Sequence, residues 1–418
     1  MTRIEEIFCQ RTARSAARAV AAQAVMPGGD TRAAAYHLPY PLTIERGEGP
    51  FVHDVDGNRY VDLVNNYTSL VHGHAYPPIV EAICSAAKHS TAWAARCDGQ
   101  VELATLLAAR VASVDKLRFT NSGTEAAMLA MQIARAATGR AKILMARHGY
   151  HGSHEDTEIG LIGMEGPRTY LAEFGNVESF ECALREHGHE IACVLLEPVM
   201  GSAGMVPAPA GFLAAVEKAA HRAGALFILD EVICFRLATG GAQSLHGITP
   251  DLTMFGKLIG GGLPVGAVGG RDDLLALTDP GKGMMFVSGT FNGNPVTTAA
   301  GVVSVHELTA DRIDAMSRHA DALRAGLERA AARCSLPLSV NQAGSLLNIF
   351  FTTEPPAATI VRTDHEQMRL FHLAALNRGV FLAPRGMIVL STVVTDAIVE
   401  GVLECLHAAF ADLAAEIL

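Results

Sequence analysis

Residues 254–262 read Met-Phe-Gly-Lys-Leu-Ile-Gly-Gly-Gly, and residues 225–231 read Ala-Leu-Phe-Ile-Leu-Asp-Glu. The second stretch predicts a buried strand of an α/β sheet, and Asp230 lies at its carboxyl end, where functional groups of such folds collect. Lys257 can condense with an aldehyde, and a buried carboxylate can keep a pyridine nitrogen protonated. The pair therefore suggests aldehyde-cofactor chemistry. Either residue alone would favour a simpler interpretation, a solvated lysine or a helix-capping aspartate.

A third stretch, residues 117–127, reads Leu-Arg-Phe-Thr-Asn-Ser-Gly-Thr-Glu-Ala-Ala. It runs from a short apolar strand into an alanine-rich helical pattern that extends to Ala137. The free N–H groups of a helix start, the hydroxyls of Ser122 and Thr124 and the permissive Gly123 would bind a phosphate without a lysine. A helix cap would use the same residues, and capping is the commoner explanation of Ser-Gly-Thr-Glu by itself.

These stretches and three further motifs follow one another along the chain as an ordered series of six. They are Asn-Ser-Gly-Thr-Glu-Ala (121–126), Gly-Tyr-His-Gly (149–152), Leu-Glu-Pro-Val (196–199), Asp-Glu-Val (230–232), Gly-Lys-Leu-Ile-Gly-Gly-Gly-Leu-Pro-Val-Gly-Ala (256–267) and Ser-Gly-Thr-Phe-Asn-Gly-Asn-Pro (288–295). In order and spacing the chain resembles the class III aminotransferases from about Met26 to the C-terminus. These are pyridoxal-phosphate (PLP) enzymes of fold type I, and they include glutamate-1-semialdehyde aminomutase and the β-phenylalanine aminotransferases.

The resemblance implies an α/β fold: a fold type I PLP-dependent transferase with a large domain on a mainly parallel sheet and a small α+β domain. The residue pattern agrees, because apolar runs at 142–146, 192–196 and 225–229 alternate with helical stretches. Such alternation is typical of a mainly parallel sheet covered on both faces. Residues 75–307 are expected to form this large PLP-binding domain.

The remaining sequence is expected to form two further parts. Residues 1–74 form an N-terminal segment of the small domain, with one alanine-rich helix over about 5–25 and a small antiparallel hairpin around Asp56-Gly57. Residues 308–418 form a C-terminal α+β domain. Its expected elements are a long helix over about 311–333, strands near 345–352 and 388–393, a loop at Glu354-Pro355-Pro356 and a last helix from about 395.

The resemblance also implies a role for each cofactor residue. Lys257 would form a Schiff base with PLP and then act as the general base of the proton shift, while Asp230 would keep the ring nitrogen protonated. Tyr150 would stack on one face of the ring and Val232 would press on the other. The phosphate would be held by Ser122, Gly123 and Thr124, with His151 and Glu197 also beside the cofactor.

Thr290 lies at a position where this family has a threonine that reaches the phosphate of the neighbouring subunit. The resemblance therefore implies a homodimer with shared active sites. It also implies that small amino acids and keto acids are the substrates.

Two arginines and a tyrosine are the candidate substrate-binding residues. Arg32 follows Met-Pro-Gly-Gly-Asp-Thr, and Arg385 lies in Ala-Pro-Arg-Gly. A guanidinium is the best partner for a carboxylate, although each arginine could be an ordinary surface residue. Arg385 and the Tyr67-Thr68 pair resemble the β-phenylalanine enzymes. We therefore expect amino-group transfer from a β-amino acid, such as 3-amino-3-phenylpropanoate, to an α-keto acid, with Arg32 binding the β-amino acid and Arg385 the α-carboxylate.

Other functions stay open at this point. The main alternative is intramolecular amino transfer like that of glutamate-1-semialdehyde 2,1-aminomutase; a decarboxylase, a racemase or a PLP-binding regulator is a further one. Asn65-Asn66 stands where the β-phenylalanine enzymes are expected to have Ala-Glu, and Ile-Cys-Phe-Arg (233–236) also departs from their pattern. Both differences put an aromatic substrate in doubt.

Composition excludes several classes of protein. The chain has 418 residues, 50% of them hydrophobic, and a formal charge of −10, whereas a nucleic-acid surface needs clustered Lys and Arg. No apolar run reaches the roughly 18 residues of a membrane span, and acidic residues interrupt the place of a signal peptide. The eight cysteines form no Cys-x-x-Cys pair and the 17 histidines show no ligand spacing, so we expect no metal site and a cytoplasmic location.

Overall fold

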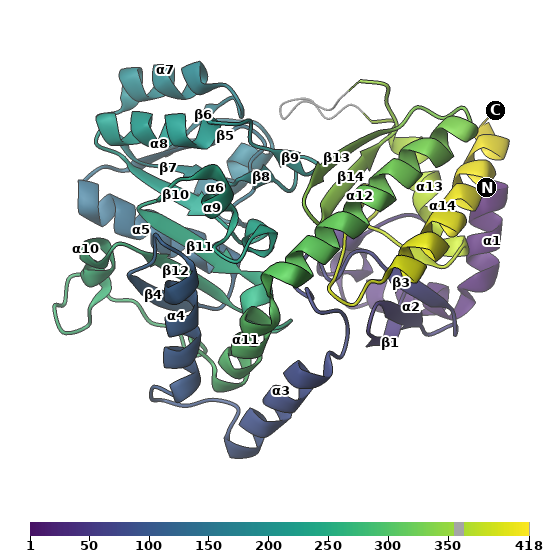
Figure 1. Cartoon of the computed structure of the whole chain (residues 1–418), viewed down its shortest axis with the longest axis horizontal. Helices are drawn as coiled ribbons and strands as arrows, with labels where there is room; N and C mark the ends of the chain where they lie inside the picture. The colour runs from purple at the N-terminus through teal and green to yellow at the C-terminus, as the bar shows by residue number, and fades with distance from the viewer. Residues whose placement is uncertain (355–362, 418) are drawn as a thin grey trace. The chain divides into compact units, whose positions relative to one another are not determined.

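The computed structural model describes residues 1–354 and 363–417 of the chain, and its course is drawn in Figure 1. The chain divides into two compact units. The larger unit comprises Pro77–Ile313, and the smaller one combines Met1–Tyr76 with Asp314–Leu418. The loop expected at Pro355 and Pro356 lies outside the described residues.

The larger unit is built on a seven-stranded sheet with the strand order β4-β12-β11-β10-β7-β5-β6. All neighbours in it run parallel except β12, which is antiparallel to both β11 and β4. The strands expected from the three apolar runs are confirmed as β5, β7 and β10. The bounds are β4 Lys116–Thr120, β5 Lys142–Ala146, β6 Thr169–Ala172, β7 Ile191–Leu196, β10 Leu226–Asp230, β11 Leu252–Gly256 and β12 Gly266–Gly270, with a separate pair β8 Val199–Met200 and β9 Val206–Pro207.

Helices cover both faces of this sheet (Figure 1). Helix α5 contacts β7, β11 and β12, while α7 contacts β6 and α8 contacts β7 and β10. The crossover through α5 runs along the sheet in the opposite direction to those through α7 and α8, so right-handed connections place them on opposite faces. The bounds are α3 Pro77–His89, α4 Asp98–Arg110, α5 Gly123–Thr138, α6 Glu155–Leu161, α7 Val177–His187, α8 Phe212–Arg222, α9 Ala242–His246, α10 Asp272–Leu275 and α11 Pro295–Glu307, with 3₁₀ turns η3 Cys234–Leu237, η4 Lys257–Gly260 and η5 Ala276–Thr278.

This two-sided cover explains why the central strands β7 and β11 are buried along their whole length instead of alternating between buried and exposed residues. Every residue of β7 and of β11 is buried. The alanine-rich face of α5 lies directly on the sheet, where its small side chains are fully buried. The sequence of these elements is thus that of a parallel sheet between two helical layers.

The smaller unit contains two sheets and five helices among the described residues. One sheet has the order β1-β2-β3-β15 and the other β13-β14-β16. The hairpin around Asp56-Gly57 is confirmed as β2 and β3. The bounds are α1 Arg3–Arg11, α2 Ala13–Gln23, η1 Pro27–Gly29, η2 Ala33–Ala35, β1 Ile44–Glu48, β2 Phe51–Asp54, β3 Arg59–Asp62, α12 Ala310–Arg333, β13 Ser339–Ala343, β14 Leu346–Phe350, α13 His365–Asn377, β15 Val380–Phe381, β16 Met387–Val389 and α14 Asp396–Ile417.

The expectation of a single N-terminal helix is wrong, because the helix breaks at Thr12. The Thr12 hydroxyl bonds to the carbonyl oxygen of Phe8 at 2.6 Å and closes α1. Asp56, from the turn of the hairpin, then accepts the backbone N–H groups of Arg14 and Ser15 at 2.6 and 2.9 Å. A carboxylate from a distant turn therefore caps α2 and starts it as a separate helix.

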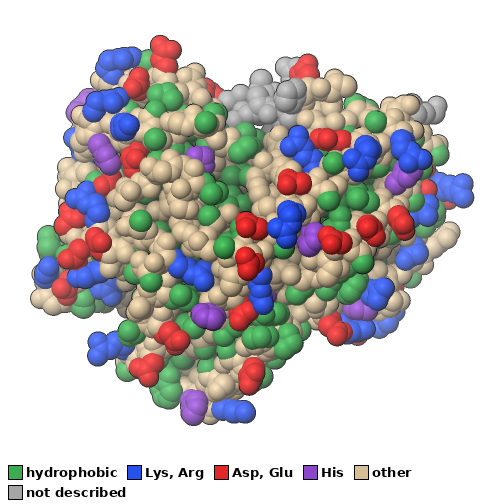
Figure 2. Space-filling view, in the orientation of Figure 1, with side chains coloured by type: hydrophobic (Ala, Val, Ile, Leu, Met, Phe, Trp, Pro, Cys, Tyr) green, Lys and Arg blue, Asp and Glu red, His purple; other side chains and the backbone are tan. Residues whose placement is uncertain are grey.

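No helix in the described part of the chain is both long and apolar enough to cross a lipid bilayer. Figure 2 shows acidic and basic side chains intermixed over the visible face of the molecule, with hydrophobic ones between them.

Candidate active site

Three ionisable residues follow three neighbouring strands of the large sheet. Glu197 comes directly after β7, Asp230 ends β10, and Lys257 comes directly after β11. Leu229 pairs with Leu196, and Asp230 pairs with Met254, so the strand ends lie side by side. Because all three strands are parallel, these side chains meet at one edge of the sheet.

Lys257 sits at this edge in a strained and partly buried position. Its φ of 50° is left-handed, a conformation that non-glycine residues adopt with a cost and that is often found at functional sites. Burial lowers the pKa of its ammonium, while the negative charges of Asp230 and Glu197 act against that decrease. The lysine is therefore a better proton acceptor and nucleophile than a solvated one.

Asp230 is held by two partners. Its Oδ1 accepts the N–H of Val232 at 2.9 Å, and its Oδ2 lies 2.8 Å from Nδ1 of His151. Burial by itself would lower the pKa of His151, but the hydrogen bond and charge of Asp230, with the charge of Glu197, raise it overall. The other ring nitrogen of His151 is buried and has no hydrogen-bond partner among the described residues. The carboxylate of Asp230 is therefore held in a fixed position at the sheet edge, and the residue is only 6% exposed.

Glu197 fastens the loop that carries Tyr150. Its Oε1 accepts the backbone N–H of Tyr150 at 3.2 Å, and its Oε2 accepts that of Gly201 at 3.0 Å. Burial raises the pKa of Glu197 to about 7. The carboxyl group therefore joins two loops at the sheet edge, next to Lys257 and Asp230.

The Ser-Gly-Thr motif starts α5, as both interpretations of its sequence require. Ser122 is the N-cap residue, and its hydroxyl accepts the N–H of Glu125 at 3.1 Å, so the capping interpretation is confirmed. The same hydroxyl can still donate its proton, and the N–H groups of Gly123 and Thr124 have no acceptor within the helix. The motif can cap the helix and bind an anion at the same time.

Glycine at position 152 allows the loop with Tyr150 and His151 to touch this helix start. A Cβ built on Gly152 would lie 2.4 Å from Oγ1 of Thr124, and the φ of Gly152 is +95°. The backbone N–H of Ser153 also bonds to Oγ1 of Thr124 at 3.3 Å. The loop and the start of α5 therefore form one closely packed surface.

We expect Gly152→Ala to weaken binding of PLP, the cofactor that the sequence resemblance implies, by about 10-fold or more, since overpacking costs about 1–3 kcal/mol and displaces Thr124. The measurement is the dissociation constant of PLP from the apoenzyme. Gly139→Ala is the matched control: Gly139 also has a positive φ, +69°, but no atom lies within 4 Å of its added Cβ. Equal affinities in the two variants would show that the close approach at 152 has no role in the site.

Val232 and Tyr150 complete the predicted cofactor set in the larger unit. A Cβ on Gly123 or on Gly256 would lie 3.3 Å from the side chain of Val232, so both glycines make room for it. Tyr150 is 36% exposed. Thr290 is an exposed residue in the segment that precedes α11.

The candidate substrate residues all belong to the smaller unit. The guanidinium carbon of Arg32 lies 5.9 Å from the centre of the Tyr67 ring, and the Tyr67 hydroxyl donates to the carbonyl oxygen of Ala34 at 2.5 Å. Burial raises the pKa of Tyr67, and the charges of Arg32 and Arg385 oppose that increase. The structure therefore places Arg32 against Tyr67, and the charge of Arg385 also acts on this tyrosine.

Two residues to which the sequence assigned no role lie beside the candidate residues, Glu231 next to Asp230 and Asn66 next to Arg32. Glu231 is fully buried and accepts the N–H groups of Ala242 and Gln243 at 3.0 and 2.7 Å, so it caps α9; burial raises its pKa to about 7. Asn66 bonds to Arg32 at 2.5 Å. The available signal for Asn66 was the consecutive Asn-Asn after a strand, because asparagine tolerates left-handed backbone.

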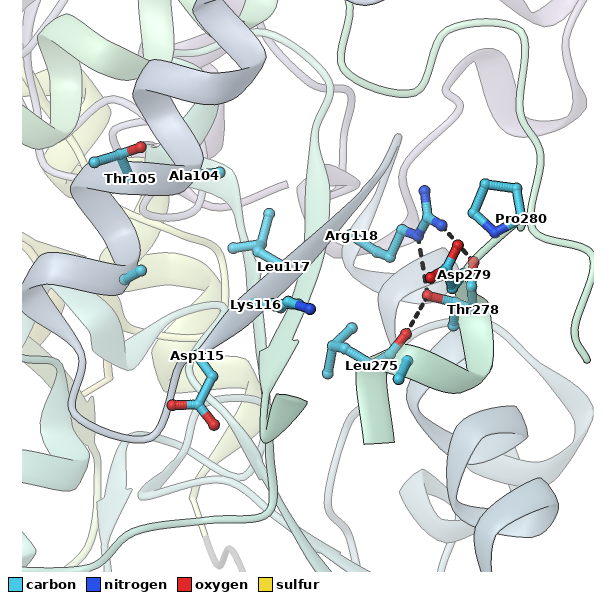
Figure 3. A pocket seen from close by; sticks show the side chains of 12 residues that line it. Ala104, Thr105, Asp115, Lys116, Leu117, Arg118, Leu275, Thr278, Asp279 and Pro280 are labelled. Atoms are coloured by element: carbon cyan, nitrogen blue, oxygen red, sulfur yellow. Dashed lines mark hydrogen bonds between the residues drawn. The ribbon is translucent and has the colours of Figure 1, made fainter. Parts of the chain in front are cut away.

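A separate hollow of about 420 Å³ lies between α4, β4 and the segment at 275–280 (Figure 3). Its two cations are already engaged: Lys116 pairs with Asp272 at 2.5 Å, and Arg118 donates to the hydroxyl and carbonyl oxygens of Thr278. None of the residues assembled at the sheet edge lines it. It is not part of the candidate active site.

Comparison with known proteins identifies the family. The family model described as "Aminotransferase class-III" matches residues 32–161 and 164–410. The chain belongs to the class III aminotransferases. It is 38% identical to glutamate-1-semialdehyde 2,1-aminomutase 2 of Bacillus cereus, over 94% of this chain and 97% of that protein.

Two solved structures are similar over nearly the whole chain. A β-phenylalanine aminotransferase from Variovorax paradoxus has a TM-score of 0.90 and 34% identity, covering 96% of this chain and 95% of that one. A structure described as a transaminase with PLP bound has a TM-score of 0.91 and 33% identity, covering 97% and 99%. The fold type I fold and the dependence on PLP are therefore confirmed.

The residues at the sheet edge of this class III enzyme fit PLP. The lysine with a lowered pKa suits the aldehyde, the buried Asp230 suits a ring nitrogen, and the start of α5 suits the phosphate. A buried nitrogen of His151, beside Asp230, also lacks a hydrogen-bond partner among the described residues. Bound PLP supplies an electron sink for the carbanion that proton removal creates. No three His, Cys, Asp or Glu side chains gather as metal ligands in the described ranges.

Proposed function

We propose that this enzyme transfers the amino group of a β-amino acid to an α-keto acid, with aromatic β-amino acids such as 3-amino-3-phenylpropanoate as the first candidates. The observation that carries the proposal is a pair of arginines without ion-pair partners, one of which, Arg32, lies over the ring of Tyr67. Arg32 and Arg385 both act on Tyr67, and neither has an ion-pair partner within 4 Å in the described part of the chain. A transaminase binds two carboxylate substrates in turn, and two unpaired cations suit that cycle.

The roles proposed for the cofactor residues are those that the family resemblance implies, and the contacts of several of these residues support them. Lys257 would attach the cofactor covalently and move the proton at the substrate carbon, and its lowered pKa supports both roles. Asp230, oriented by His151, would pair with the ring nitrogen. Tyr150 and Val232 would bind the ring, and Glu197 fixes the loop of Tyr150. The phosphate is held by Ser122, Gly123 and Thr124, and by Thr290 of a second subunit.

A homodimer with shared active sites belongs to the proposal. The segment around Thr290 exposes large apolar side chains: Phe286 is 96% exposed, Met284 63% and Phe291 60%. Such side chains close together favour contact with another protein surface. We also propose a cytoplasmic location, supported by eight cysteines that are all free.

The second candidate function is an aminomutase, because glutamate-1-semialdehyde 2,1-aminomutase 2 is 38% identical to the chain. The test measures product from racemic 3-amino-3-phenylpropanoate with pyruvate or 2-oxoglutarate, each substrate omitted in turn, and from glutamate-1-semialdehyde alone. The proposal requires both an amino donor and a keto acid. Turnover of glutamate-1-semialdehyde without any keto acid, and none of the β-amino acid, would replace it by the aminomutase.

Arg32→Ala is expected to reduce kcat/KM for the β-amino acid by about 10- to 100-fold, because a hydrogen bond to a charged group contributes about 1.5–3 kcal/mol. The half-reaction with an α-amino acid should be retained, while Arg385→Ala should show the reverse pattern. Arg46→Ala, which changes an exposed arginine of the same unit, serves as the control. An unchanged β-amino acid rate in Arg32→Ala would remove the assignment of Arg32.

A further inference from the structure

We infer that Asn66 is a specificity-determining residue, which positions the Arg32 guanidinium through a neutral oxygen and so leaves its positive charge available to a substrate carboxylate. This inference rests on the proposed function, because it deepens the role of Arg32. Asn66 itself is a positioning residue in it: the substrate carboxylate is bound by Arg32.

The contacts of the Asn66 amide fix which of its atoms faces the arginine. Nη1 of Arg32 donates to Oδ1 of Asn66 at 2.5 Å, and Nδ2 of Asn66 donates to Oγ of Ser69 at 2.8 Å. The Ser69 hydroxyl in turn donates to the carbonyl oxygen of Asn66 at 3.1 Å. An arginine offers only donors, so the amide oxygen must face it, and Ser69 holds the amide in that orientation.

The backbone under Asn66 is unusual and firmly held. Residues 65–68 all have a positive φ, at 48°, 48°, 54° and 81°, which is a left-handed turn without any glycine. Asn65 is buried; its Nδ2 donates to the carbonyl oxygen of Val389 at 2.7 Å, and its N–H donates to Oδ1 of Asp62 at 3.0 Å. Strained conformations persist where the surrounding structure over-determines them. The position of the Asn66 side chain is therefore set by the strands on either side.

Tyr67 makes two further contacts with the segment of Arg32 to Ala34. Its ring lies under the Arg32 guanidinium, and its hydroxyl donates to Ala34, two residues further along the chain. Successive residues of the left-handed turn thus hold Arg32 by one hydrogen bond and one ring contact. Both contacts are electrically neutral, and most of the five guanidinium N–H groups stay available for a planar carboxylate.

Arg32 has no carboxylate partner in the described residues, so its charge is available to bind a substrate carboxylate. In residues 1–354 and 363–417, no Asp or Glu oxygen lies within 4 Å of the Arg32 guanidinium; the neighbouring Asp30 accepts the backbone N–H of Arg32 instead, at 2.9 Å. An acidic residue at position 66 would form an ion pair with Arg32 and compete with the substrate. The neutral amide positions the cation without this competition.

The test compares Asn66→Asp with the wild-type holoenzyme. Aspartate has the same shape and also tolerates positive φ; it loses the N–H that donates to Ser69, but the Ser69 hydroxyl can donate to the carboxylate instead, so the exchange mainly adds a charge. We expect KM for 3-amino-3-phenylpropanoate to increase by about 10- to 100-fold with kcat little changed, whereas the carboxylate-free analogue 1-phenylpropan-1-amine keeps its rate. The inhibition constant of the unreactive carboxylate 3-phenylpropanoate should increase by the same factor.

Two further variants keep the test decisive. Asn66→Gly keeps the left-handed backbone and removes the amide, so it should weaken carboxylate binding less than Asn66→Asp does, while still sparing the amine. Gln10→Glu makes the same amide-to-carboxylate exchange on an exposed face of α1 and should change nothing. Thermal melting and cofactor absorbance, measured on every variant, identify any misfolded protein.

The inference and the proposed function fail in different ways. If the wild-type enzyme acts on no β-amino acid, the proposed function is wrong, and direct binding of 3-phenylpropanoate to the wild type and the variants, measured by calorimetry, still tests Asn66. Equal binding of 3-phenylpropanoate by wild type, Asn66→Asp and Asn66→Gly would overturn the inference. Equal loss of carboxylate and amine activity in Asn66→Asp would overturn it too, since it would show a merely structural role.

Discussion

Lys257→Ala is expected to reduce transamination by at least about 10⁴-fold. A positioned general base alone contributes about 10²- to 10⁴-fold, and this lysine also provides the covalent attachment of the cofactor. It stands directly after β11, in left-handed backbone and beside Asp230 and Glu197. No other lysine in the described residues is placed at this edge of the sheet.

The measurement combines kcat with the absorbance of the purified variant near the visible edge. We expect both the activity and that band to disappear, and added PLP to be removed by dialysis. Lys218→Ala, which changes an exposed lysine of α8, should keep both. A Lys257→Ala enzyme that retains the band and turns over at more than about one hundredth of the wild-type rate would contradict the assignment.

Asp230→Asn should have the second largest effect, with kcat lower by about 10²- to 10⁴-fold. The amide keeps the shape of the side chain but removes the negative charge opposite a protonated ring nitrogen. Leaving one member of a buried charge pair alone costs roughly 3–5 kcal/mol, which corresponds to that factor. His151 would also lose the charge that raises its pKa.

The diagnostic readout for Asp230→Asn is kcat together with the cofactor content. We expect the enzyme to keep at least part of its PLP, because Lys257 and the start of α5 are unchanged, yet to transfer amino groups slowly. Glu178→Gln, an exposed acid-to-amide exchange on α7, should behave as wild type. A fully active Asp230→Asn variant would exclude a charge role for Asp230.

The fold of the larger unit could be predicted from the sequence because its determinants are local. The strands β5, β7 and β10 are short apolar runs, and the polar Asp230 marks the end of β10, so these strands and the position of Asp230 could be predicted, whereas β11 was not. In a parallel sheet such ends meet at one edge, where functional groups collect.

The features that sequence reasoning missed depend on contacts between distant residues. The helix break at Thr12 needs the carboxylate of Asp56, more than forty positions later, and no local pattern contains that contact. Asn66 was seen only as a departure from related enzymes, because its bond to Arg32 spans a separation of 34 residues. The capping role of Ser122 could be predicted, since its partner Glu125 lies three residues away.

The enzyme is proposed to take the amino group from a β-amino acid in one half-reaction and to give it to a keto acid in the next. The most direct test of this claim records the absorbance of the wild-type holoenzyme during titration with racemic 3-amino-3-phenylpropanoate, followed by 2-oxoglutarate or pyruvate. We expect the band near the visible edge to bleach with the β-amino acid alone and to return only after the keto acid is added. A band that does not bleach with this donor, while glutamate-1-semialdehyde is converted without any keto acid, would contradict the claim.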